Sequence, residues 1–199
     1  MSTPRTRLTA DARTEQIVAR AEELIRETGF QALSIAAVAD ACGLTRAGVL
    51  HHVGSKEQLL IAILEAKERE TATEIEELVG RTGRQDAREV LDVLMRRNID
   101  RPEIIHLFTV LAAESINVAH PAHAYFAERI RRGARELAPL FEDYSDAPDQ
   151  VALEVLSYMD GLQLNWLRDR SIDIWGRWSD FQHRYFAALA ADSHRTVGA

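Results

Sequence analysis

Residues 34–58, SIAAVADACGLTRAGVLHHVGSKEQ, contain the start and stop signals of two short helices and the start of a third. Ser34 and Thr45 each precede a helical segment, where a hydroxyl can accept a hydrogen bond from the free amides of the first turn. Gly43 stands at the end of the first segment, because glycine adopts the left-handed backbone of a C-terminal cap without a steric penalty. Ser55, with a glutamine three residues later, forms the pattern of a capping box. The stretch therefore predicts two helices joined by a tight turn and followed at once by a third.

This arrangement is typical of a helix-turn-helix, whose second helix enters the major groove of DNA. The predicted second helix runs from Arg46 to His52 and, apart from Val49, carries mainly polar or small residues. Arginine and histidine can donate hydrogen bonds to bases or phosphates, and alanine and glycine let the backbone approach the duplex. The alternative is a surface helix-turn-helix with no DNA partner. The candidate DNA-binding residues are Ser34, Thr45, Arg46, Ala47, Gly48, Leu50, His51, His52 and Lys56.

Residues 13–64 resemble the N-terminal domain of TetR-family transcriptional regulators. The marks that carry the resemblance are, in order, Glu27-Thr28-Gly29-Phe30, then Ser34-Ile35-x-x-Val38-Ala39, then His52-Val53, and finally Gly54-Ser55-Lys56-Glu57-x-Leu59-Leu60. The chain departs from the family at Leu50, where many members have a tyrosine that contacts the DNA backbone. The resemblance implies an all-α fold of about nine helices, in which a helix-turn-helix domain precedes a helical ligand-binding and dimerisation domain.

Length and charge fit that division. The chain has 199 residues, of which 46% are hydrophobic and 28% charged, so it is predicted to be globular. We expect residues 1–57 to form the DNA-binding domain with an N-terminal arm, and residues 58–199 the effector-binding and dimerisation domain. Residues 1–57 hold seven cationic and seven anionic side chains, so the whole net charge of −7 lies in residues 58–199. That acidic part would repel nucleic acid and so orient the molecule.

The cysteine content and the N-terminal residues bear on the compartment and on further DNA contacts. The single cysteine, Cys42, excludes an intrachain disulfide and is interpreted as a core residue. The sequence shows neither a leader pattern nor an apolar run that could span a membrane, so we expect a cytoplasmic protein. Arg5 and Arg7 lie in the arm, where they could reach a minor groove or belong to a solvated tail.

Apolar periodicity predicts the remaining helices. Phe30 and Leu33 are expected to close the small core, Gly80–Gln85 to form a linker, and the arginine run 129–135 to be a solvated face. The segment that begins at Pro102 is apolar almost all round and is therefore expected to be buried. The predicted ranges are about 11–28, 56–79, 86–98, 102–118, 148–169 and 172–191, with one more helix that ends near residue 144.

The resemblance implies an effector cavity within residues 86–191 and a homodimer formed by the last two long helices. Mostly apolar walls with few polar groups favour a lipophilic or aromatic effector. The candidate effector-binding residues are Phe108, Leu111, Glu114, Ser115, Met159, Gln163, Trp166 and Trp175. The candidate dimer residues are Gly161, Leu164, Trp178 and Phe181. Both groups have the same alternative, which is that their members belong to the protomer's own core.

The function expected from these features is a dimeric repressor that an effector releases from a palindromic operator, with half-sites about 34 Å apart. We predict no catalytic site, no cofactor and no metal. A regulator that is independent of effector, or that activates, is one alternative. The other is a helical metal-binding enzyme, because Glu103 and His106 have the Glu-x-x-His spacing of di-iron bundles. Asp180 and His183 repeat that spacing.

Overall fold

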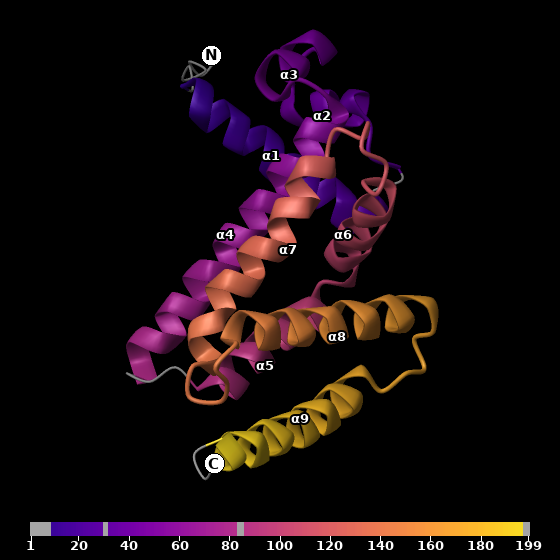
Figure 1. Ribbon diagram of the computed structural model, residues 1–199. Coiled ribbons are helices and arrows are strands. Elements are labelled where there is room, and N and C mark those ends of the chain that lie inside the picture. The colour runs from indigo at the N-terminus through magenta and orange to yellow at the C-terminus, as the bar shows by residue number, and fades with distance from the viewer. Residues whose placement is uncertain (1–8, 30–31, 83–85, 197–199) are drawn as a thin grey trace. The chain divides into compact units, whose positions relative to one another are not determined.

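The computed structural model of the protein describes residues 9–29, 32–82 and 86–196, and within them every regular element is helical (Figure 1). This confirms the predicted all-α class. The contacts divide the chain into two units, Met1–Arg69 and Glu70–Ala199. The elements are α1 (Ala10–Thr28), α2 (Ile35–Cys42), α3 (Arg46–Val53), α4 (Lys56–Thr82), α5 (Ala87–Asp100), α6 (Pro102–Glu114), α7 (His123–Leu137), the 3-10 helix η2 (Ala138–Phe141), α8 (Pro148–Arg168) and α9 (Ile174–Thr196).

The caps predicted around the helix-turn-helix are confirmed. The Oγ atom of Ser34 accepts from the amide of Ala37 at 3.1 Å, and Gly43 has a φ of 63° at the end of α2. The Oγ1 atom of Thr45 accepts from the amide of Gly48 at 3.0 Å. These bonds pair backbone amides that the helices leave without an intrahelical partner, and so they define where α2 and α3 begin.

The core of the first unit is formed by one apolar face from each short helix. The buried apolar side chains of this unit are Ile17, Ala21 and Ile25 of α1, Leu33, Val38, Ala39 and Cys42 around α2, Val49 and Val53 of α3, and Leu59, Leu60, Ile63 and Leu64 of α4. Burial raises the pKa of the Cys42 thiol, which agrees with its interpretation as a core residue. Phe30, expected in the same core, and the arm with Arg5 and Arg7 lie outside the described residues.

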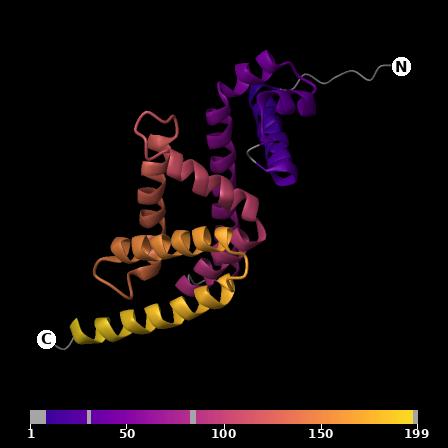
Figure 2. The same ribbon diagram turned by 90° about the vertical axis from the view of Figure 1, so that its right-hand side faces the viewer.

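The second unit is a set of helices that pack around α8. Helix α8 contacts α6, α7, η2 and α9, and α5 contacts α9. Figures 1 and 2 both show α9 running beside α8. The buried aromatic side chains at the centre of this unit are Phe141, Trp166, Trp178 and Phe186. None of the helices in the ranges that the structure describes has the length and apolar character needed to cross a membrane.

Four predicted helix ends are wrong, for local reasons. Helix α6 stops at Glu114 rather than near 118, so Ile116 is 80% exposed. Helix α7 gives way to η2 at Ala138 because Pro139 has no amide hydrogen for an α-helical bond. Helix α4 continues to Thr82, into the predicted linker, whose residues 83–85 lie outside the described residues. Helix α9 likewise extends five residues past its predicted end, to Thr196.

Candidate functional site

Helix α3 has one buried and one exposed face. Val49 and Val53, one turn apart, are buried in the core of the first unit. The side chains of Arg46, Ala47, His51 and also Leu50, which is 40% exposed, face solvent. The valines therefore fix the rotation of the helix about its axis, and the outer face presents a guanidinium, an imidazole and an apolar patch.

The start of α3 leaves little room for side chains. A Cβ atom placed on Gly48 would lie 3.2 Å from Oγ1 of Thr45, the atom that caps the helix. A residue larger than glycine here would press on that cap. The rings of His51 and His52 meet edge to face with centroids 5.4 Å apart. Ser34 is exposed and Lys56 is half-buried.

Sequence comparison places this domain in a known family. The family described as "Bacterial regulatory proteins, tetR family" matches residues 17–63, which contain α2, α3 and the capped turn between them. Residues 17–63 therefore form a TetR-family DNA-binding domain. A search of curated proteins found no match.

Solved structures share the fold of this chain along most of its length. One is Thermus thermophilus FadR, described as a TetR-family transcriptional repressor in complex with lauroyl-CoA: it is 18% identical with a TM-score of 0.64, covering 85% of this chain and 91% of that one. NalD of Pseudomonas aeruginosa, described as the secondary repressor of the MexAB-OprM multidrug efflux pump, is 20% identical with a TM-score of 0.61, covering 89% and 96%. AibR, in complex with isovaleryl coenzyme A and operator DNA, is 25% identical with a TM-score of 0.52, covering 78% and 86%.

Three of the predicted effector residues share one buried face of α8. Met159, Gln163 and Trp166 follow each other at helical spacing, and all three are buried. Within the described residues, the Nε2 atom of Gln163 is buried and has no hydrogen-bond partner. A buried polar group left without a partner costs about 1–3 kcal/mol. The buried face of α8 therefore carries one amide donor without a partner among apolar side chains.

A second group of side chains joins α6, α7 and α8, and it was not predicted from the sequence. The guanidinium of Arg129 lies over the ring of Phe108 at 4.6 Å, and Phe108 meets Phe126 edge to face at 6.4 Å. Arg129 also lowers the pKa of Asp160, but burial acts more strongly and the net shift is upward. The arginine run is therefore not simply a solvated face. The sequence does contain an indication of this group, because Tyr125 and Phe126 precede Arg129 by about one helical turn.

Asp160 combines solvent access with desolvation. Its side chain is exposed to solvent, yet surrounding protein raises its pKa. Asp160 is three residues before Gln163 on α8.

The remaining predicted effector residues have other partners. The hydroxyl of Ser115 donates to the carbonyl of Ala112 at 2.8 Å, and the exposed Glu114 lies 3.9 Å from Nε2 of His120. Both therefore hold the turn after α6. Leu111 is buried on α6. Trp175 is half-buried on α9, where the guanidinium of Arg96 covers its ring at 4.0 Å.

The predicted dimer residues fall into two classes. Trp178 is 0% exposed and its Nε1 atom donates to Oδ1 of Asp92 at 2.9 Å, so it belongs to the protomer's own core and we remove it from the interface. Gly161, Leu164 and Phe181 are half-buried. A Cβ atom placed on Gly161 would meet no protein atom within 4 Å. The space beside Gly161 is therefore open in a single protomer.

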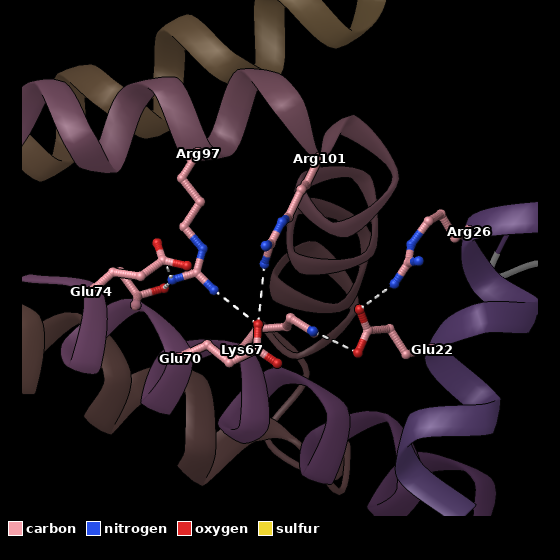
Figure 3. Close-up of polar contacts among 8 residues, drawn as sticks. Glu22, Arg26, Lys67, Glu70, Glu74, Arg97 and Arg101 are labelled. Atoms are coloured by element: carbon pink, nitrogen blue, oxygen red, sulfur yellow. Dashed lines mark hydrogen bonds and ion pairs between the residues drawn. The ribbon is translucent and has the colours of Figure 1, made fainter.

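Ion pairs anchor α4 within each unit (Figure 3). In the first unit, Nζ of Lys67 lies 2.5 Å from a carboxylate oxygen of Glu22 on α1, and both side chains are largely buried. In the second unit, the buried Arg97 of α5 pairs with Glu70 at 3.1 Å and Glu74 at 3.3 Å. The sequence analysis did not single out these residues, because partners that lie far apart in the sequence are matched only by the fold.

The Glu-x-x-His pairs do not converge on a shared centre in the parts of the chain that are described. Glu103 is half-buried and His106 is exposed on α6, and Asp180 and His183 are exposed on α9. Among the described residues, no three His, Cys, Asp or Glu side chains are grouped so that they could hold a metal ion.

Proposed function

We propose that this TetR-family regulator is a homodimeric repressor that binds a palindromic DNA operator and is released by a small, mostly apolar effector. The observation that carries the proposal is the exposed face of α3, which two buried valines hold in a fixed orientation. The operator DNA and coenzyme A thioesters named with the relatives support this class of function. Residues 1–57 would bind DNA and residues 58–199 would bind effector and the second copy.

In the proposed mechanism, α3 enters the major groove and the capped amides at its start approach a phosphate. Arg46 and His51 would donate to base edges or phosphates, and Leu50 would make apolar contact. The contribution of Ser34, Thr45 and Lys56 would be contacts to the backbone of the DNA. An effector releases the DNA if it binds more tightly to a conformer whose two domains no longer match the half-sites.

The first test is DNA footprinting on genomic fragments with the wild type and Arg46→Ala. We expect the wild type to protect a palindromic site, and Arg46→Ala to weaken protection about 10–100-fold, as for the loss of one good base contact. Arg20→Ala is the matched control, because it removes the same charge from an exposed position on α1. Diffuse, salt-sensitive binding that is the same in all three proteins would contradict the proposal.

The dimer is tested by Gly161→Glu. Because the space beside Gly161 is open in the protomer, the substitution should leave the fold intact. It should introduce a charge into the interface, so light scattering should give the mass of one chain for the variant and of two for the wild type. A dimeric Gly161→Glu protein would show that this face of α8 is not the interface.

A further inference from the structure

The buried amide of Gln163 differs from the other buried glutamine of the second unit. Gln163 is 4% exposed and its Nε2 atom has no partner among the described residues. Gln182 is 6% exposed, and its Nε2 atom donates to the carbonyl of Arg88 at 3.4 Å. The two side chains have the same chemistry and nearly the same burial. Only one of them has a hydrogen-bond donor that the protein leaves unused.

The surroundings of Gln163 define what could accept from this donor. Met159 and Trp166 lie on the same buried face of α8, one turn before and one turn after. The guanidinium of Arg170, in the turn after α8, lies over the ring of Trp166 at 3.8 Å. The donor is therefore part of an apolar wall, in which an incoming oxygen atom would be shielded from water.

We propose that the effector is an uncharged apolar molecule with a carbonyl-type oxygen, as in a ketone, ester or lactone, that accepts a hydrogen bond from Nε2 of Gln163. This inference rests on the proposed effector-responsive function and adds the chemical class of the effector. An amide N–H pairs with a neutral carbonyl oxygen without adding charge to the protein interior, whereas a buried carboxylate would need a cation.

The nearby charges favour an uncharged ligand over an anionic one. Asp160 lies three residues before Gln163, and its carboxyl attracts no anion in either protonation state. The cation beside it, Arg129, already lies over Phe108 and interacts with Asp160. The other nearby cation, Arg170, lies over the ring of Trp166 at the exposed end of α8, so a free fatty acid or an acyl-coenzyme A would meet no buried cation beside Gln163 among the described residues. The effector proposed here therefore differs in charge from the coenzyme A thioesters named with FadR and AibR.

The first experiment compares the thermal stability of Gln163→Met and Gln182→Met in the full chain. Methionine has about the same volume as glutamine and no amide. Gln163→Met removes an unpartnered polar group, so Tm should rise by about 2–4 °C. Gln182→Met removes an amide that donates to the carbonyl of Arg88, so Tm should fall. A lower Tm for both variants would show that the Gln163 amide is satisfied in the free protein, and would overturn the proposal.

In the second experiment, matched probes are added to the protein and binding is followed by the change in tryptophan fluorescence, since Trp166 lies three residues from Gln163. The probes are methyl ketones and γ-lactones of nine to thirteen carbons, with alkanes and carboxylic acids of the same chain lengths. At least one ketone or lactone should bind about tenfold more tightly to the wild type than the matched alkane does. Gln163→Met should abolish that preference, and Gln182→Met should keep it. The proposal fails if no carbonyl probe is preferred, if the preference survives in Gln163→Met, or if the acids bind most tightly.

Failure of this inference can be distinguished from failure of the proposed function. Footprinting of the same wild-type preparation reports DNA binding without any effector. Specific DNA protection without a carbonyl preference would reject only the effector class. A carbonyl preference without specific DNA protection would reject the repressor and leave Gln163 as a ligand-binding residue.

Discussion

Trp178→Ala should lower the free energy of unfolding of the second unit by about 3–5 kcal/mol, the range for truncating a large buried aromatic side chain. Trp178 is 0% exposed and packs beside Phe181 and Tyr158, whose ring centroids lie 5.7 Å and 6.5 Å away. The change opens a cavity and also leaves Asp92 without the indole N–H that now donates to it. Urea unfolding followed by far-ultraviolet circular dichroism measures the effect.

Trp175→Ala is the matched control on the same helix. Trp175 is only half-buried: it packs against the same core, and the guanidinium of Arg96 lies over its ring. A cation–π contact at a partly exposed site is worth about 0.5–1 kcal/mol, so the loss should be well below that of Trp178→Ala. Equal losses in the two variants would show that the protomer core does not centre on Trp178. If Trp178 instead belonged to the dimer interface, its truncation would change the mass in solution more than the stability.

Glu22→Gln should destabilise the first unit by about 3–5 kcal/mol, the usual range for breaking a buried ion pair by removing one partner. The ammonium of Lys67 lies 2.5 Å from Glu22, and the side chains are 8% and 15% exposed. Glutamine keeps the size of the side chain but not the charge, so the lysine charge stays in a mostly buried position without its carboxylate (Figure 3). Hydrogen exchange of the amides of α1 and α2, combined with urea unfolding, reports on this unit.

Glu23→Gln is the matched control, because it removes the same charge from an exposed ion pair instead of a buried one. Glu23 is the next residue on α1 and pairs with Arg20 at the same distance, 2.5 Å, but the side chains are 47% and 51% exposed. Exposed pairs contribute about 0–1 kcal/mol, so this variant should be close to wild type. Adding Lys67→Met to Glu22→Gln should recover part of the lost stability, because the buried ammonium that has lost the Glu22 carboxylate is then absent. Similar stabilities for the two glutamine variants would contradict the explanation.

Helix starts, turn residues and apolar faces could be predicted from the sequence because they depend on interactions within a few residues. Ser34 and Thr45 cap the helices that follow them, and Gly43 adopts the left-handed conformation. The exposed face of α3 also followed from local pattern, because two valines one turn apart define the buried side. These features carry the family assignment and the proposed interface with DNA.

Partners far apart in the sequence could not be predicted in this way. Lys67 and Glu22, Arg129 and Phe108, and Trp178 and Asp92 come together only when helices pack. The sequence placed Trp178 and Gln163 on apolar helical faces, but periodicity does not distinguish a face that meets the protomer's core from one that meets a second copy or a ligand. The packing of the helices decides between these cases. Trp178 is completely buried, the amide of Gln182 donates to a carbonyl, and Nε2 of Gln163 has no acceptor among the described residues. Local hydrogen bonds and periodicity thus determined the helices and the face of α3, whereas the burial of charges, amides and aromatic rings depended on which helices the tertiary fold brought together.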